Sequence, residues 1–169
     1  MAISSPETLQ AHHLISDFDC GKESLNIWLK NRALTNQQRG FSVVIVAHEN
    51  HRVVGYYGLA PTAVISKELP RSMRTGQPPN PIPCLLLGQL ATDKHFIGQG
   101  IGLGLLRHAL ERCVQGANLI DGRAVVVHAI DDEAAIFWQK QGFTPSTDNR
   151  LTLFRSIQDI ALSLGLTKP

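Results

Sequence analysis

Alternating glycines are the feature of this sequence that most constrains its fold. From residue 98 the chain reads Gly-Gln-Gly-Ile-Gly-Leu-Gly and then continues as an apolar helical stretch. Glycine lets the backbone approach a ligand closely, and the first N–H groups of a helix have no partner inside the helix. The helix dipole also favours negative charge at this end. The run therefore predicts a main-chain binding site for the phosphate groups of a cofactor.

Other interpretations of the glycines are weaker. A Walker loop requires Gly-Lys-Ser/Thr at its end, but Leu105 and Leu106 occupy that region. A dinucleotide fold places an acidic residue about 20 residues further on, at the end of a second strand. Asp121 lies near this distance but precedes the next predicted strand. One alternative stays open, in which the glycines only allow a helix to pack tightly against a strand.

Composition places the chain among globular proteins and excludes little else. Its 43% hydrophobic and 18% charged residues indicate a chain with a real core, and 169 residues predict one domain spanning residues 1–169. A net charge of +2 permits a nucleic-acid partner without arguing for one. Three widely spaced cysteines suggest reduced thiols in a cytoplasm. We find no signal sequence or membrane-spanning run, and His12-His13 has no further ligands nearby in sequence, so no metal site is expected.

Hydrophobic periodicity divides the chain into alternating elements. Helices are predicted at residues 21–33, 33–39, from the glycines to about 113, 131–141 and 157–164. Strands are predicted at residues 41–48, 53–65, 84–92, 124–129 and 151–154, with a proline-rich loop at 76–83. The first two strands should form a hairpin whose regular pairing ends at Pro61. This order predicts an α/β chain with a mixed sheet, whose parallel part lies within residues 84–129.

Three segments in this order resemble the GNAT superfamily of N-acetyltransferases, which use acetyl-coenzyme A. They are LGQLATD at residues 87–93, GQGIG at 98–102, and DDEAAIFW at 131–138 running into QGF at 141–143. The resemblance implies the GNAT fold, with a central mixed, splayed sheet flanked by helices. It also implies that the phosphorylated cofactor is acetyl-coenzyme A (acetyl-CoA).

A narrower resemblance covers about residues 14–160. Phe18-Asp19-Cys20-Gly21, the Gly55-Tyr56-Tyr57 strand and Val127-His128-Ala129 are similar to one GNAT branch. That branch contains bacterial toxins that acetylate the amino group of aminoacyl-tRNA and so block translation in the cytoplasm, and their usual partner is a ribbon-helix-helix antitoxin. Two alternatives remain: an acetyltransferase for a small-molecule or protein amine, and a non-catalytic protein that binds coenzyme A or an antitoxin. Pairing of the chain with itself as a homodimer also stays open.

The resemblance carries a set of site residues over to this chain. A backbone N–H near Leu90 or Ala91 would face the carbonyl oxygen of the acetyl group. Asp131 would lie near the cofactor, although it could equally be a helix N-cap. The expected cofactor-binding residues are Leu90, Ala91, Thr92, Gly98, Gln99, Gly100, Ile101, Gly102, Leu103, Asp131 and Phe137.

The chain departs from the superfamily pattern at two positions. Ile97 stands where Gln or Arg is usual, which a site built from backbone N–H groups should tolerate. Trp138 stands where the toxin branch has the catalytic Tyr. An indole N–H donates a hydrogen bond but delivers no proton at these pH values, so Trp138 predicts a slow or silent enzyme. The alternative is that Trp138 packs beside Phe137 without a catalytic role.

The acceptor amine and its carrier set the remaining expectations. A free α-amino group has a pKa of about 7.7–8.0, so it needs little help from a base, and no base is evident in the sequence. Tyr56, Tyr57 and His128 are interpreted first as structural residues. Contacts to tRNA phosphates could come from basic residues that could equally be ordinary surface charges. These are Lys30, Arg32, Arg39, Arg71 and Arg74.

Overall fold

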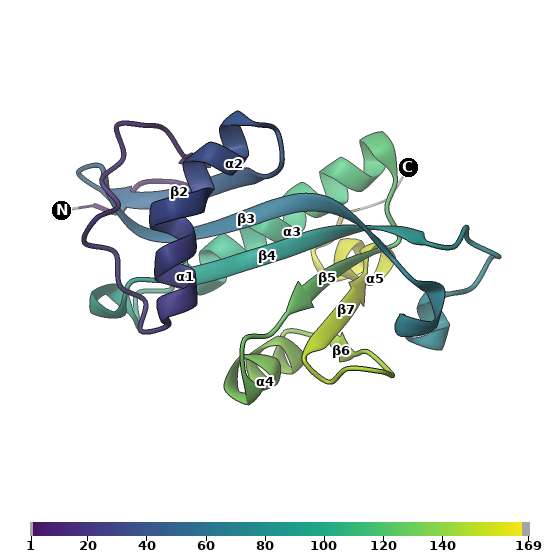
Figure 1. Cartoon of the computed structure of the whole chain (residues 1–169). Coiled ribbons are helices and arrows are strands. Elements are labelled where there is room, and N and C mark those ends of the chain that lie inside the picture. Colours follow the sequence, from purple (N-terminus) through teal and green to yellow (C-terminus); the bar gives the residue numbers. More distant parts are fainter. Residues whose placement is uncertain (1, 167–169) are drawn as a thin grey trace. The chain divides into compact units, whose positions relative to one another are not determined.

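A computed structural model describes residues 2–166 (Figure 1). Its seven strands are β1 (Glu7–Thr8), β2 (Val43–Glu49), β3 (Arg52–Val64), β4 (Ile82–Thr92), β5 (Ala124–His128), β6 (Thr144–Pro145) and β7 (Thr152–Ser156). The α-helices are α1 (Glu23–Trp28), α2 (Leu34–Gln38), α3 (Ile101–Ile120), α4 (Asp132–Lys140) and α5 (Ile157–Ser163). A π-helical turn, η1 (Leu29–Ala33), joins α1 to α2, and short 3-10 turns lie at η2 (Ser66–Glu68), η3 (Arg71–Met73) and η4 (Lys94–Phe96).

The strands form one mixed sheet in the order β1-β2-β3-β4-β5-β7-β6. β2 and β3 form the predicted antiparallel hairpin, and its turn uses the positive φ angles of Asn50 and His51. β4 and β5 are parallel, with Leu85 opposite Val125. The mixed sheet and its parallel pair were both expected from the sequence, and both are confirmed. The hairpin pairing ends at Leu59, two residues before Pro61, although β3 itself continues to Val64.

The chain divides into two compact units, which we describe separately. Unit 1 comprises residues 1–60 and 87–109, and unit 2 comprises residues 61–86 and 110–169. β3, β4 and α3 each pass from one unit into the other. The expectation of one domain over residues 1–169 therefore stays a prediction.

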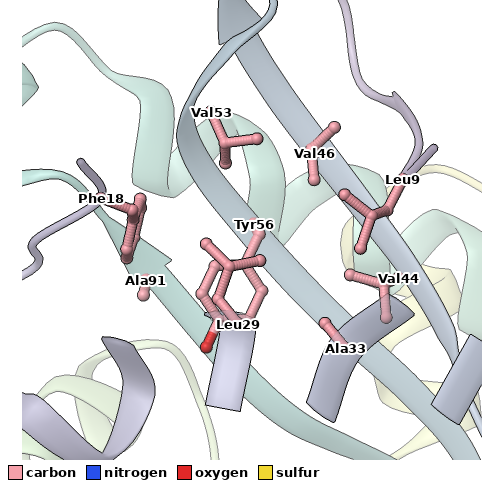
Figure 2. Packing of buried hydrophobic residues seen from close by; sticks show 9 residues of the cluster. All are labelled: Leu9, Phe18, Leu29, Ala33, Val44, Val46, Val53, Tyr56 and Ala91. Carbon is pink, nitrogen blue, oxygen red and sulfur yellow. The ribbon is translucent and has the colours of Figure 1, made fainter. Parts of the chain in front are cut away.

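The core of unit 1 lies between the first helical segment and the β2–β3 hairpin (Figure 2). Tyr56 of β3 occupies its centre, fully buried, and its hydroxyl donates a hydrogen bond to the Leu25 carbonyl at 2.7 Å. The Trp28 ring stacks on Tyr56 with only 2° between the two planes. Each large buried side chain of this kind contributes about 1.5–3 kcal/mol of transfer free energy. The cluster consists of Leu9, Phe18, Leu29, Ala33, Val44, Val46, Val53, Tyr56 and Ala91.

Unit 2 has a separate core along β5 and β7. These two strands pair antiparallel over their whole length, and every residue from 124 to 127 is buried. A strand buried on both faces is expected to be continuously apolar, as Ala-Val-Val-Val is here. The cluster consists of Val64, Leu69, Met73, Ile82, Cys84, Ala124, Val126 and Phe154.

Several element boundaries differ from those predicted. α3 continues to Ile120 rather than stopping near 113, because Val114 and Ala117 extend its buried stripe by another turn. β4 begins at Ile82, two residues earlier than predicted, and β7 covers 152–156 rather than 151–154. β1 and β6 were not predicted, since a two-residue strand has no periodicity to read and is defined only by its neighbour. Among the described residues, no helix combines the length and hydropathy needed to cross a bilayer.

Candidate active site

The alternating glycines form the bend between β4 and α3, as the sequence predicted. Gly98 and Gly100 have φ angles of +88° and +78°, a conformation that residues with a side chain rarely adopt. The Gly104 N–H donates to the Gly100 carbonyl, so Gly100 begins the hydrogen-bonding pattern of α3. The N–H groups before Gly104 therefore have no partner inside the helix. A methyl group added at Gly98 or Gly100 would meet nothing within 4 Å, so the backbone there is open to a ligand.

Close packing fixes the first turn of α3 on the strands below it. A Cβ at Gly55 of β3 would lie 2.7 Å from Leu105 and 3.0 Å from Ile101. A Cβ at Gly102 would lie 3.1 Å from the Thr92 hydroxyl oxygen at the end of β4. The alternative interpretation of the glycine run, tight helix-to-strand packing, therefore holds for Gly102, and Gly55 of β3 also packs closely against the helix. It does not explain Gly98 and Gly100, which have open space instead.

A buried carboxylate anchors the segment that leads into the glycines. Asp93 is fully buried directly after β4, and its two oxygens accept hydrogen bonds from the backbone N–H groups of Asp19 (3.1 Å) and His95 (2.9 Å). The backbone N–H of Lys94 donates to the Asp19 carbonyl at 2.8 Å. The loop around Asp19 thus holds residues 93–96 in place. This segment begins at Asp93, five residues before Gly98. Sequence analysis had noted Asp19 and Asp93 only as parts of motifs.

Hydrogen bonds and an ion pair keep the carboxylates of Asp93 and Asp19 ionised. Burial raises the pKa of Asp93, but hydrogen bonds from His95 and Asp19 outweigh it and leave the pKa below its ordinary value. Asp19 forms an ion pair with Lys94 at 2.9 Å, and hydrogen bonds from Lys94, Gly21 and Asn26 hold its pKa far below the usual range. The two carboxylates are therefore anions at neutral pH.

The residues predicted around α4 lie in unit 2. Asp131 is the N-cap of α4, and its side chain accepts from the Ala134 N–H at 2.8 Å. This confirms the structural interpretation of Asp131 and leaves a cofactor contact as a prediction. Trp138 is buried, with its ring edge-to-face against Phe137 at 5.2 Å and Phe143 at 5.1 Å. Packing is therefore one role of Trp138.

Comparison with known proteins identifies the family. Residues 40–145 match the acetyltransferase (GNAT) domain. The chain belongs to the GNAT acetyltransferase family. It is also 37% identical to the tRNA-acetylating toxin of Mycobacterium tuberculosis (strain ATCC 25618 / H37Rv), over 96% of this chain and 97% of that protein.

Two solved structures of similar proteins extend the match to the fold. AtaT complexed with acetyl-methionyl-tRNAfMet has a TM-score of 0.87 and 27% identity, covering 96% of this chain and 99% of AtaT. A tyrosine-to-phenylalanine variant of the AtaT toxin, bound to the C-terminus of the antitoxin AtaR and acetyl-CoA, has a TM-score of 0.82 and 26% identity. That match covers 98% of this chain and 99% of the variant. Both comparisons confirm the GNAT fold that the sequence predicted.

The remaining cofactor-binding predictions for this GNAT chain fall in unit 1. Ala91 is buried, whereas Leu90 and Thr92 are half-buried at the end of β4. Gln99 is exposed and Leu103 is 57% exposed on the first turn of α3, beside the open glycines. The structure therefore gathers the residues from Leu90 to Leu103 into one continuous bend, which stays the predicted diphosphate site.

The basic residues predicted to contact tRNA fall in two separate groups. Lys30, Arg32 and Arg39 are exposed on the first helical segment of unit 1. Arg71 and Arg74 lie in unit 2, where Arg71 is exposed and the buried Nε of Arg74 has no hydrogen-bond partner among the described residues. The four exposed residues, Lys30, Arg32, Arg39 and Arg71, are accessible to solvent, and their contact with phosphate stays a prediction.

The structural interpretation of the tyrosines and of His128 is supported. Tyr57 is fully buried, and its hydroxyl lies 2.6 Å from Nδ1 of His108 on α3. His128 is exposed and its Nδ1 lies 3.3 Å from the Thr152 hydroxyl. Sequence reasoning missed His108, because a single histidine on an amphipathic helix gives no signal of its partner on a distant strand.

Proposed function

We propose that this protein is a toxin that transfers the acetyl group of acetyl-CoA to the α-amino group of an aminoacyl-tRNA, and so blocks translation. The observation that carries the proposal is the open glycine bend at the start of α3, in a chain 37% identical to a tRNA-acetylating toxin. GNAT acetyltransferases use acetyl-CoA, and a relative of the same fold has been solved with it. The acceptor follows from the two relatives whose names include tRNA.

The residues present fit a diphosphate-bearing cofactor. Free N–H groups at a positive helix end, with no side chain above Gly98 and Gly100, suit the diphosphate of coenzyme A. Acetyl-CoA supplies the acetyl group as a reactive thioester. A backbone N–H near Leu90 or Ala91 would donate to the acetyl carbonyl oxygen and stabilise the charge that develops there.

Proton transfers set what the side chains must do. The α-amine, with a pKa of about 7.7–8.0, has a substantial deprotonated fraction near neutral pH and needs only a weak base. The departing sulfur must gain a proton. Trp138 would donate a hydrogen bond to the sulfur without protonating it, so water would supply the proton. Turnover should therefore be slow.

Partners follow from the same relatives. AtaT has been solved with the C-terminus of the antitoxin AtaR, and we propose that an antitoxin, expected to be of the ribbon-helix-helix class, binds this chain. The site of action would be the cytoplasm, where charged tRNA is found. Acetylation of a small-molecule or protein amine is the competing function, and the experiment below separates the two.

The proposal is tested by following the acetyl group. The purified chain is incubated with [14C]acetyl-CoA and total tRNA that carries its amino acids. We expect label on the aminoacyl ester, released by mild base as an N-acetyl amino acid. A pool of the same tRNA without amino acids is the control and should stay unlabelled. Label on protein or on free amines alone would reject the tRNA acceptor.

Salt dependence tests whether phosphate contacts hold the tRNA. A plot of log kcat/KM against log salt concentration should have a negative slope. Each lost contact should make that slope less steep by about 0.7–0.9. We expect this for a Lys30→Ala/Arg32→Ala variant and for an Arg71→Ala/Arg74→Ala variant. Arg112→Ala, on the exposed side of α3, is the matched control and should keep the full slope. Acetylation that does not respond to salt would contradict phosphate binding by these residues.

A further inference from the structure

A closed circuit of four imidazole rings lies at the β2–β3 turn. His12 and His13 come from the N-terminal loop, and His48 and His51 come from the hairpin. Neighbouring ring centroids are 4.3 Å apart for His12–His13, 5.0 Å for His12–His51, 5.4 Å for His48–His51 and 5.2 Å for His13–His48. Glu7 of β1 joins the same cluster. The sequence argument against a metal site assumed that His12 and His13 stand alone, and the structure removes that premise.

Two of the histidines are fixed as hydrogen-bond donors to Glu7. Nδ1 of His13 accepts from the Gln10 backbone N–H at 2.8 Å, and Nδ1 of His48 accepts from the His51 backbone N–H at 3.1 Å. An accepting Nδ1 carries no proton, so Nε2 of each neutral ring carries it. Both Nε2–H groups therefore donate to the same oxygen of Glu7, at 2.8 and 2.7 Å. These hydrogen bonds also lower the pKa of Glu7 and keep it ionised.

The other two histidines have open ring nitrogens. His12 and His51 are exposed, and within residues 2–166 their rings make aromatic contacts but no hydrogen bond. A ligand atom of His12 lies within 4.8 Å of those of Glu7 and His13. His51 has a φ of +69°, unusual for a residue with a side chain, and its ring lies edge-on to His12. The Glu7 carboxylate therefore lies close to His12, and the ring of His51 adjoins that of His12.

We propose that Glu7, His12 and His51 bind one divalent transition-metal ion, with Zn²⁺ as the reference ion. Imidazole and carboxylate together suit Zn²⁺, whereas Mg²⁺ and Ca²⁺ prefer oxygen ligands alone. His13 and His48 orient the carboxylate, as hydrogen-bonded partners of metal ligands usually do. They do not bind the ion themselves, because their Nε2 lone pairs are protonated. The exposed side chains of His12 and His51 would rotate so that one ring nitrogen of each comes within bonding distance of the same ion as Glu7.

Binding should be coupled to folding of the N-terminal segment. Glu7 and His51 are 44 residues apart in sequence, and Glu7 reaches the hairpin only when β1 is paired with β2. An ion that binds the folded chain alone raises its stability by mass action. Histidine ligands must be deprotonated, so binding should weaken in acid.

The test is calorimetric titration of the tag-free chain with ZnCl₂ at pH 7.5. We expect one ion per chain with a Kd in the micromolar range, a higher Tm with Zn²⁺, and no binding of Mg²⁺. His12→Ala and His51→Ala should each weaken binding at least about tenfold, the scale set by losing a metal ligand or its support. His128→Ala, an exposed histidine of unit 2, is the control and should bind as the wild type does.

Three results would overturn the proposal. They are no saturable heat at millimolar Zn²⁺, unchanged affinity in His12→Ala or His51→Ala, and equal loss of affinity in His128→Ala. Circular dichroism of each variant without metal checks that the fold is intact. The proposed acetyltransferase function does not depend on this site, so the two proposals fail or stand separately.

Discussion

At the residue scale, the indole of Trp138 is the side chain with the most consequence. It is buried against Phe137 and Phe143, so packing alone gives it a reason to be apolar and aromatic. By the resemblance drawn from the sequence, this position corresponds to the catalytic Tyr of the toxin branch. Two aromatic variants, one with a hydroxyl and one without, can test whether a phenol at this position speeds the reaction.

Trp138→Tyr should accelerate acetylation of charged tRNA. A phenol can deliver a proton to the departing sulfur, and general acid catalysis is worth about 10²–10⁴-fold. Trp138→Phe is the matched control, since it makes a similar change in packing without adding a hydroxyl, and it should not be faster than the wild type. Single-turnover rates measure both. If the Tyr variant is no faster than the Phe variant, our account of position 138 is wrong.

Asp93→Asn should weaken the interaction of the β4–α3 bend with the diphosphate of acetyl-CoA. Asp93 accepts from two backbone N–H groups with different oxygens, and an amide offers only one oxygen, so one N–H would face an NH₂ group. We expect kcat/KM to fall about tenfold for acetyl-CoA and to stay within about twofold for acetyl-pantetheine, which lacks the diphosphate. Asp17→Asn, an exposed neighbour of the loop, is the control. An equal fall for both substrates would show a general structural effect instead.

At the element scale, the β4–α3 bend joins a strand, a buried anchor and a helix end, and we propose that it binds the diphosphate. The anchor at Asp93 fixes its start, and close packing at Gly55 fixes its end. Between them Gly98 and Gly100 have the positive φ angles that expose successive N–H groups. The bend therefore depends on backbone conformation more than on any side chain, and we expect it to tolerate Ile97 in place of a polar residue.

Gly100→Ala should weaken coenzyme A binding. Alanine at a φ of +78° costs about 1–2 kcal/mol in backbone strain, so the bend would relax away from its open conformation. Gly116→Ala, inside α3, is the matched control; this position has ordinary φ and open space, and the change should raise stability by up to about 1 kcal/mol without affecting binding. Calorimetry with desulfo-CoA measures binding, and urea denaturation measures stability. Equal binding by both variants would contradict the role of the bend.

At the scale of the whole molecule, the chain consists of two compact units that share three elements. β3 and β4 contribute residues to both cores, and α3 passes from one unit into the other. Unfolding one unit would remove part of the support of these elements in the other. We therefore expect one cooperative transition, in line with the sequence-based expectation of a single domain.

Two tryptophans make this expectation measurable. Trp28 lies in unit 1 and Trp138 in unit 2, and they are the only two in the sequence. Urea unfolding of Trp28→Phe and Trp138→Phe, followed by fluorescence, reports each unit in turn. For each variant we expect the fluorescence midpoint to coincide with the midpoint from circular dichroism, since coincident probes indicate two-state unfolding. A fluorescence midpoint that departs from circular dichroism in either variant would show that the units unfold independently.

The sequence by itself determined the features that are local in the chain. Periodicity located the long elements, and the glycines located the helix start, because both depend on backbone preferences within a few residues. Motifs at residues 87–143 were enough to indicate the family. Only the tertiary structure revealed the Asp93 anchor, the Tyr57–His108 pair and the four-histidine circuit. Each depends on segments far apart in sequence, and their contacts exist only once the sheet has brought those segments together.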